Sequence, residues 1–348
     1  MSKPKVTIQD IADSLKLSRN TVSKALNGNK NIAEETRKKV IEEAIKLKYK
    51  HFAFMNTENL TAQKKGGNIA LFTNHLPTGS HFGSMLLSEL EKKISAEGYN
   101  LSIHILRDTE INALALPNNF ELKSVDGIVC IEQFDKKYSQ LISSLGIPTI
   151  FIDCTADVSY NELNADILLM ENMHSTYSVT KKLIENGYNK IGFIGDYNHC
   201  KSFNERWVGF NKALSDYNIE LNLSYCILDS DQYPYNDFNW IKSKLDTMKN
   251  LPSAFICAND FIAISTMKAL KNKNITIPDE IAICGFDDSP EASIVEPSLT
   301  TVHIFSTDMG IIAAEMLISR LKNSSKPYQI THVKTKPIYR KSTNIKFN

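Results

Sequence analysis

The sequence predicts an all-α helix-turn-helix headpiece followed by a two-lobed α/β body with two doubly wound parallel sheets. Within residues 1–50, apolar side chains recur only at helical spacing. From Asn68 onward, short apolar runs alternate with amphipathic helical patterns, the rhythm of doubly wound sheets. The 348 residues suit two or three domains. We expect a headpiece at 1–50, a hinge or linker at 51–67 and a two-lobed domain at 68–348.

The composition predicts a soluble cytoplasmic protein. Hydrophobic residues make up 42% of the chain and charged residues 23%, values typical of globular proteins. No apolar run approaches the roughly 18 residues that a membrane span needs, and the N-terminus lacks the apolar core of a secretory signal. The six cysteines are isolated, with no C-x-x-C pair, so we expect reduced thiols without a metal or disulfide framework.

The charge is divided unevenly along the chain. Residues 1–65 hold 14 Lys and Arg against 7 Asp and Glu, which gives +7, whereas residues 66–348 hold 26 against 32, which gives −6. A compact basic segment on an acidic body indicates a polyanion as partner. A solvated helical face is the alternative explanation of the same charge.

The headpiece divides into short helices, each with one apolar face. Thr7 caps the first, and after a tight turn Ser18 caps a second helix that ends near Asn27. A third helix, with an apolar stripe from Thr36 to Leu47, braces the pair. This arrangement is the helix-turn-helix motif, although a three-helix protein-binding module would show the same periodicity.

Polar side chains on the outer face of the second helix suit DNA. Arg19 and Asn20 can make paired hydrogen bonds to guanine and adenine edges in the major groove. Lys24 lies on the same face, with Thr21 and Ser23 as short hydroxyl groups for phosphate oxygens.

The segments VTIQDIA, SRNTVSKALN and TRKKV, with Tyr49 after them, resemble the headpiece of the LacI/GalR family of bacterial repressors. The resemblance implies base contacts from Arg19, Asn20 and Lys24. It implies backbone contacts from Thr7, Ser18, Thr21, Ser23 and Asn27, with Tyr49 closing the headpiece and counted among the DNA-binding residues.

The chain departs from the family pattern at three places. Lys16 stands where Gly is usual in the turn, which costs about 1 kcal/mol if that residue is left-handed. Ala33 stands where Ser or Thr usually caps the third helix, which forgoes about 1 kcal/mol. In the hinge, His51 replaces the expected proline. Met55 and Leu60, and also the aromatic Phe52 and Phe54, are candidate minor-groove wedges, but packing against the head or a partner subunit explains them equally well.

Polar residues follow several predicted strands of the body. Asp153 ends IPTIFID, Asn259 ends SAFICAN and Asp287 follows IAICGF, while Arg206 lies near the start of the helix after KIGFIGD. Ligands of such sheets bind outside the carboxyl ends of the strands, and these groups suit a polyhydroxylated ligand. Each of them can instead be a loop or helix cap, and Asp260 in particular is expected to cap the next helix.

The body also resembles the family, in blocks such as ERWVGF and IPDEIAICGFDDSP, which implies a periplasmic-binding-protein-like fold. It implies effector contacts from Phe82, Asp153, Arg206, Asn259 and Asp287. It further implies a first lobe at 68–162 and 302–330, a second lobe at 163–298 and 331–343, and three crossings near 161–164, 297–303 and 331–333. The helices around SMLLSELEKK and GIIAAEMLIS are candidate dimer contacts, or ordinary core.

The sequence favours a regulator over other classes. It contains no G-x-S-x-G, P-loop, H-E-x-x-H or dinucleotide fingerprint, so we expect no enzyme, cofactor or metal. A transport receptor would share the body but predicts a signal peptide and no DNA-binding head. The prediction is therefore a homodimeric repressor of carbohydrate genes that binds near-palindromic operator DNA under control of a small effector, with no membrane partner. A sugar is expected; a purine or a phosphoprotein co-regulator remain alternatives.

Overall fold

A computed structural model describes residues 6–26, 32–49, 66–75 and 81–345, apart from the side chains of Glu34, His81 and Phe82. The chain forms two compact units, residues 1–66 and residues 67–348. Nearly all of the predicted hinge at 51–67 lies outside the described residues, as does Asn27.

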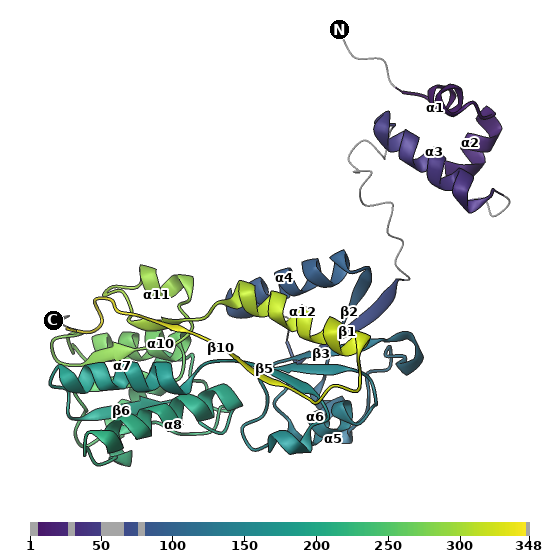
Figure 1. Ribbon diagram of the computed structural model, residues 1–348. Coiled ribbons are helices and arrows are strands. Elements are labelled where there is room, and N and C mark those ends of the chain that lie inside the picture. The colour runs from purple at the N-terminus through teal and green to yellow at the C-terminus, as the bar shows by residue number, and fades with distance from the viewer. Residues whose placement is uncertain (1–5, 27–31, 50–65, 76–80, 346–348) are drawn as a thin grey trace, which may run out of the picture. The chain divides into compact units, whose positions relative to one another are not determined.

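The first unit is the expected set of three helices (Figure 1). They are α1 (Ile8–Leu15), α2 (Arg19–Leu26) and α3 (Glu34–Lys46). Their apolar faces meet in one small core that is built on Ile11, Val22 and Val40 and closed by the buried Tyr49. The tertiary contacts of this core hold helices that would be too short to persist in isolation.

Both departures predicted at the ends of headpiece helices are confirmed. Lys16 adopts the left-handed conformation, with φ 55° and ψ 38°, at the C-terminus of α1. Ala33 precedes α3 and makes no side-chain cap. The headpiece therefore contains one strained turn and one helix without a side-chain cap.

The first lobe of the second unit contains a six-stranded parallel sheet in the order β10-β5-β4-β3-β1-β2. Figure 1 shows helices α4 and α12 on one face of this sheet, with α5 and α6 on the other. Gly310 of α12 allows the close approach, because a Cβ atom there would lie 2.3 Å from the Leu86 carbonyl oxygen of α4. The strands are β1 (Gly67–Thr73), β2 (Tyr99–Ile105), β3 (Gly127–Ile131), β4 (Thr149–Ile152), β5 (Asp166–Met170) and β10 (Ile330–Val333); the helices are α4 (His81–Ala96), α5 (Asp108–Ala113), α6 (Lys136–Ser143) and α12 (Ser306–Lys322).

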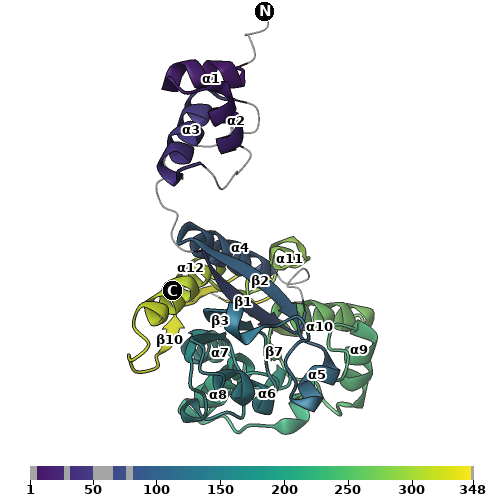
Figure 2. The same ribbon diagram turned by 90° about the vertical axis from the view of Figure 1, so that its right-hand side faces the viewer.

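The second lobe contains a three-stranded parallel sheet in the order β6-β7-β8. Figure 2 shows α7 and α8 on one side of β7, with α9 and α10 on the other. The expected strand in YCILDSD contributes only an isolated bridge between Ile194 and Ile227. The elements are β6 (Ile191–Ile194), β7 (Ala254–Cys257), β8 (Ala282–Cys284), α7 (Met173–Glu185), α8 (Lys201–Asp216), α9 (Phe238–Thr247), α10 (Asp260–Asn272) and α11 (Pro290–Ile294).

The sheets place the crossings later in the chain than expected. Strand β5 pairs in parallel with β4, and β10 pairs with β5, so residues 166–170 and 330–333 belong to the first sheet and not to the second lobe. The chain crosses after β5, after β9 (Thr301–His303) and between β10 and β11 (Lys336–Ile338). The lobe boundaries near 162 and 330 were wrong because a fully apolar strand carries no mark of the sheet that it joins.

The candidate dimer stripes are mainly core. Leu86, Leu90 and Leu317 are completely buried between α4, α12 and the first sheet. Only Met85, which is 40% exposed, leaves much apolar surface free on these stripes. An apolar stripe at helical spacing was therefore no guide to an interface.

Candidate functional site

The second helix of the headpiece presents the predicted DNA-reading groups to solvent. Arg19, Asn20 and Lys24 are exposed, while Val22 and Ala25 on the opposite face are buried. Because α2 is held by its apolar face, the long polar side chains remain free to meet base edges.

Hydroxyl side chains fix the beginnings of the first two helices. The Thr7 hydroxyl accepts a hydrogen bond from the Asp10 amide, and the Asp10 carboxylate accepts from the Thr7 amide at 2.6 Å. The Thr7 hydroxyl also donates to this carboxylate at 2.7 Å, and the hydrogen bonds from the Thr7 hydroxyl and amide lower the pKa of Asp10. The Ser18 Oγ accepts from the Thr21 amide at 3.0 Å and lies 2.8 Å from the Thr21 Oγ1. Ser18 is exposed, whereas Thr21 and Ser23 are half-buried.

In the body, a cavity of about 870 Å³ brings four of the predicted effector residues together. They are Asp153, Arg206, Asn259 and Asp287, which come from both lobes. The side chain of Phe82 lies outside the described residues. The cavity opens at the carboxyl ends of strands in both sheets, as expected for doubly wound folds.

Arg206 is the buried centre of this cavity. Its Nε donates to the Asn172 Oδ1 at 3.0 Å, and its Nη1 donates to the Ala258 carbonyl at 2.6 Å. The same Nη1 lies 3.5 Å from the Asp287 Oδ1, and the guanidinium lies over the Phe286 ring at 3.7 Å from its centroid. These contacts fix the guanidinium before any ligand arrives.

Arg206 is also connected to a crossing between the lobes. Asn172, which is fully buried, follows β5 and donates from Nδ2 to the Glu205 carboxylate at 3.0 Å. Glu205 in turn lies 3.3 Å from the His332 Nε2 on β10. A ligand that moves Arg206 therefore disturbs hydrogen bonds at two places where the chain changes lobe.

Asp153 lies directly after β4 in the left-handed region, at φ 60°. Its Oδ1 accepts from the amides of Cys154 at 2.8 Å and Ser202 at 3.3 Å, which links the first lobe to α8. Burial raises the pKa of this carboxyl group, against the lowering effect of its hydrogen bonds. Part of the hydrogen-bonding capacity of Asp153 is therefore already used by amides of the protein itself.

The expected cap of α10 was assigned to the wrong residue. The Asn259 Oδ1 accepts from the Ile262 amide at 2.9 Å, so Asn259 is the N-cap. Asp260 is fully buried and instead accepts from the Ser289 amide at 2.8 Å and the Thr301 hydroxyl at 2.6 Å. Burial raises the pKa of Asp260, and the Asp287 charge raises it further. Asp260 ties α10 to the segment that leads to the second crossing.

Asp287 has φ 114° and stands between the cavity and that crossing. Its amide donates to the Val302 carbonyl on β9 at 2.9 Å. Burial raises the pKa of Asp287, Arg206 opposes this, and the charge on Glu132 raises it again. The pKa of the Asp287 carboxyl group therefore depends on charges from both lobes, Arg206 from the second and Glu132 from the first.

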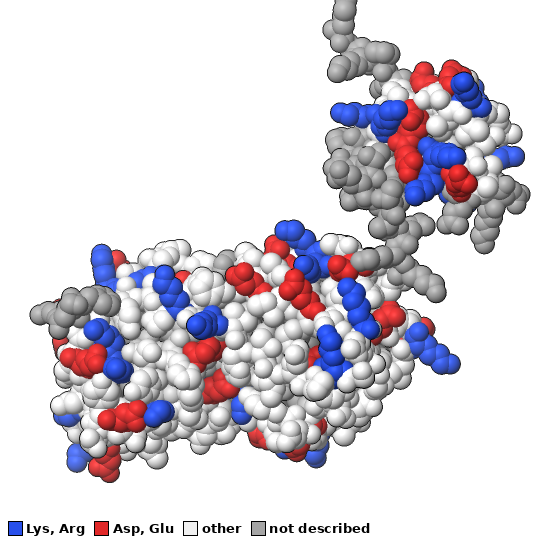
Figure 3. All heavy atoms as spheres, viewed as in Figure 1, with Lys and Arg blue, Asp and Glu red and all other residues white. Residues whose placement is uncertain are grey.

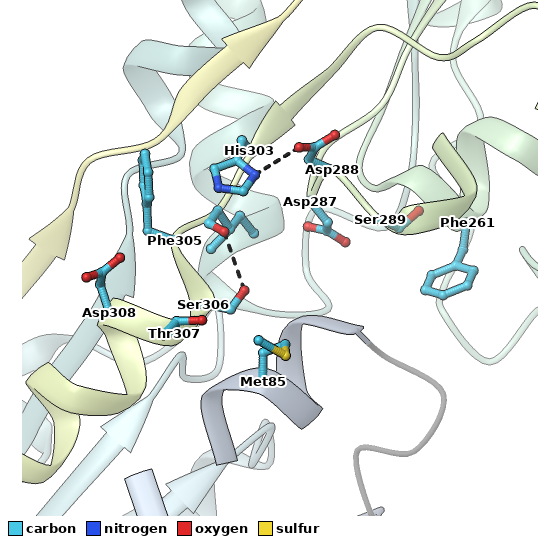
Figure 4. Close-up of a pocket in the computed structure, with 11 residues that line it drawn as sticks. Met85, Phe261, Asp287, Asp288, Ser289, His303, Phe305, Ser306, Thr307 and Asp308 are labelled. Carbon is cyan, nitrogen blue, oxygen red and sulfur yellow. Dashed lines mark hydrogen bonds and ion pairs between the residues drawn. The ribbon is translucent and has the colours of Figure 1, made fainter. Parts of the chain in front are cut away.

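A smaller cavity of about 230 Å³ adjoins the first and shares Phe261, Asp287 and Ile304 with it. Figure 4 shows Met85 and Ser306, at the starts of α4 and α12, on one side, with Asp287 and Asp288 opposite. The His303 Nδ1 lies 2.8 Å from the Asp288 Oδ2, and Arg340 donates to the other oxygen at 2.6 Å. The main cavity thus extends to the crossing segments.

The sequence did not reveal several cavity residues. Glu132 follows β3 directly and has φ 55°, so the end of the run GIVCI was the available signal. Phe134, Phe203 and Phe261 provide aromatic walls, and the His199 Nδ1 lies 2.5 Å from the Asp231 Oδ2 at the rim. None of these followed from a motif, because they converge only in the folded chain.

Three findings concern metal sites, membrane-spanning helices and disulfides. No group of three His, Cys, Asp or Glu side chains within the described residues is arranged to hold a metal ion. No described helix is both long and apolar enough to cross a bilayer. All six cysteines are free thiols.

Comparison with known proteins agrees with both units. Residues 7–51 match the model of bacterial regulatory proteins of the lacI family, and residues 180–343 match a periplasmic binding protein-like domain. The HTH-type transcriptional repressor PurR of Histophilus somni (strain 2336) is 26% identical over 341 residues, 97% of this chain and 98% of the relative. The chain therefore joins a lacI-family helix-turn-helix domain to a periplasmic binding protein-like domain.

A second curated relative is similar over nearly the whole chain, and a solved structure shares the fold. The ribose operon repressor of Haemophilus influenzae is 28% identical over 326 residues, 93% of this chain and 94% of the repressor. A structure described as the transcriptional regulator CelR–cellobiose complex superposes with a TM-score of 0.70 at 19% identity, covering 97% of this chain and all of that one. The chain is a DNA-binding transcriptional regulator, and the relatives that it resembles are repressors and not enzymes.

Proposed function

We propose that this chain is a cytoplasmic, homodimeric repressor whose affinity for near-palindromic operator DNA is set by a small polyhydroxylated effector, and that it controls carbohydrate genes. The main support is that Arg206 and Asp287 are both hydrogen-bonded to the crossing segments: Arg206 donates to Asn172 at 3.0 Å, and the Asp287 amide donates to the Val302 carbonyl at 2.9 Å. An effector that binds these two side chains favours one arrangement of the lobes over another. DNA and effector then change each other's affinity by the same factor.

The headpiece supplies the DNA contacts in this proposal. Arg19, Asn20 and Lys24 read bases, while Thr7, Ser18, Thr21, Ser23 and Asn27 contact the backbone. Tyr49 is only 6% exposed, so we assign it the task of orienting the headpiece rather than a direct DNA contact. Binding driven by phosphate contacts weakens steeply with salt.

The dimer is proposed to form along β2, the edge strand of the first sheet. Ile103 and Ile105 point the same way from this strand and are 44% and 46% exposed, whereas His104 between them is buried. Replacing both isoleucines with Asp should give monomers in sedimentation velocity. Leu223→Asp, at a side chain that is 60% exposed in the second lobe, is the control and should leave the dimer intact. A dimer that survives the double replacement would overturn this interface.

A purine effector is the second candidate, favoured by the relatives named PurR and by the aromatic walls Phe134, Phe203 and Phe261. A thermal-shift screen of the full chain against sugars, sugar phosphates and purines separates the candidates. A ligand at 100 times its Kd should stabilise the body by about 2.7 kcal/mol. A sugar that raises the melting temperature supports the proposal, and a purine that alone does so supports the alternative. No response across the panel would turn attention to a protein co-regulator.

A further inference from the structure

The lining of the main cavity is strongly acidic. On the face of the body seen in Figure 3, basic and acidic side chains are mixed. The cavity differs, because Arg206 is the only Lys or Arg among the described residues that line it, with His75 and His199 as further titratable groups. The carboxylates that line it are Asp108, Glu132, Asp135, Asp153, Asp196, Asp231 and Asp287.

Most of these carboxylates already have partners. Asp135 caps α6, and Asp196 accepts from the amides of Asn198 and Asp231. Asp153 holds two amides, and Asp231 lies beside His199, as described above. These groups satisfy the protein's own donors and need no ligand.

Glu132 and Asp287 differ from these four carboxylates, and Asp108 differs from both in being exposed. Glu132 is half-buried and makes no hydrogen bond or ion pair within the described part of the chain, and its left-handed backbone is unfavourable for Glu. Asp287 has a single cationic partner among the described residues, the Arg206 Nη1 at 3.5 Å. Glu132 follows β3 of the first lobe and Asp287 follows β8 of the second, so two poorly compensated carboxylates approach one cavity from opposite lobes.

The surroundings of Glu132 give the same picture. Burial raises its pKa; His199 and His75 lower it, and Asp153 raises it. The neighbouring Asn74 also lines this wall, and its Oδ1 is buried without a donor among the described residues. The wall therefore offers acceptors that lack a cationic donor.

We propose that the ligand carries a protonated amine on a polyhydroxylated skeleton, as in an amino sugar with a free amine; this proposal rests on the proposed effector site. The ammonium group of the ligand faces Glu132. The ammonium supplies three donors and a positive charge between the two lobes. Phe134, Phe203 and Phe261 offer aromatic faces to the C–H groups of the ring and to the cation. A sugar phosphate would add negative charge where Arg206 is already engaged by three groups.

The test is isothermal titration of the full chain with matched sets of ligands. Each set contains a 2-amino-2-deoxyhexose (of glucose, galactose or mannose), its N-acetyl derivative, the parent hexose and the hexose 6-phosphate, and spermidine is added as an amine without hydroxyl groups. At least one amino sugar should bind ten-fold or more tightly than the other members of its set. Glu132→Gln should reduce this preference to less than two-fold, whereas Glu121→Gln, at an exposed carboxylate of the same lobe, should preserve it.

Several results would overturn the assignment. One is that a parent hexose, an N-acetyl sugar or a hexose 6-phosphate binds as tightly as the amino sugar of its set, or more tightly. The others are that spermidine alone binds, that no amino sugar binds, or that the preference for the amino sugar is unchanged in Glu132→Gln. A neutral sugar that binds and loses affinity in Asp287→Ala would overturn the amine but keep the effector site. Failure of the proposed function would appear separately, as absence of sequence-specific DNA binding by the full chain.

A second measurement needs no ligand. A carboxyl group whose pKa is higher in the folded state destabilises the fold as pH rises through its unfolded value of about 4.3 toward its folded value, and the loss then stays constant. Glu132→Gln should therefore raise the melting temperature at pH 7.5 by about 2 °C, and the gain should vanish near pH 4. A lower melting temperature at pH 7.5 would show that the Glu132 charge is already compensated, which contradicts the proposal.

Discussion

Helix α2 of the headpiece and the main cavity of the body hold their polar side chains in opposite ways. Arg19, Asn20 and Lys24 project from α2 into solvent, and the opposite face of the helix fixes their position. Arg206, which lines the cavity, and Asp260, which is next in sequence to the lining residue Asn259, are almost completely buried and are fixed by hydrogen bonds to segments far away in the sequence. The side chains that we propose to read DNA can therefore be exchanged without disturbing the fold, whereas the side chains in and beside the cavity are part of it.

Asp260→Ala should show the largest effect, because it removes a buried acceptor and leaves two donors, the Ser289 amide and the Thr301 hydroxyl, without a partner. We expect a loss of about 3 kcal/mol in the free energy of unfolding of the body, measured by urea denaturation. Asn259→Ala, which removes the adjacent helix cap, is the control and should cost about 1 kcal/mol. Equal losses for the two variants would contradict the structural role given to Asp260.

Arg19→Ala should leave stability within about 0.5 kcal/mol of the parent, since the side chain is exposed. It should weaken binding to the selected operator by about 2 kcal/mol and relax the preference for one base pair. Fluorescence anisotropy with selected and random duplexes checks both effects, with Lys39→Ala on α3 as the control. If specific and non-specific binding fall equally, Arg19 contacts phosphate rather than a base.

Lys16→Gly should show the smallest effect, and in the opposite direction. Glycine adopts φ 55° without the steric cost borne by lysine, so the headpiece should gain about 1 kcal/mol. Hydrogen exchange of the α1 and α2 amides in the full chain measures the gain. Lys46→Gly, in the last turn of α3, should instead speed exchange. Unchanged protection in Lys16→Gly would mean that the left-handed turn carries no strain.

The same contrast explains what the sequence could predict. Helical periodicity and capping are local properties, so the three headpiece helices, the left-handed Lys16 and the missing cap at Ala33 were all predictable. The alternation of strands and helices likewise predicted both sheets. The ends of predicted strands indicated Asp153, Asn259 and Asp287, the start of a predicted helix indicated Arg206, and all four residues line one cavity.

Long-range pairing was not predictable in this way. Asp260 follows a strand as a cap would, but it accepts from partners 29 and 41 residues away, and the neighbouring Asn259 accepts from the Ile262 amide as the cap. The sheet to which β5 belongs depends on its register with β4, which an apolar run does not encode. Glu132 escaped notice because its lack of a partner is a property of the folded cavity.

Regulated DNA binding is tested most directly by fluorescence anisotropy with a duplex selected from a random pool. The duplex is titrated with the parent chain and with Asp287→Ala, each in the presence and absence of a ligand found by thermal shift. The ligand should change the operator affinity of the parent at least five-fold. Asp287→Ala should bind the ligand-free operator as the parent does and show no ligand response. A full response in Asp287→Ala, or equal loss of ligand-free DNA binding, would contradict control through the cavity.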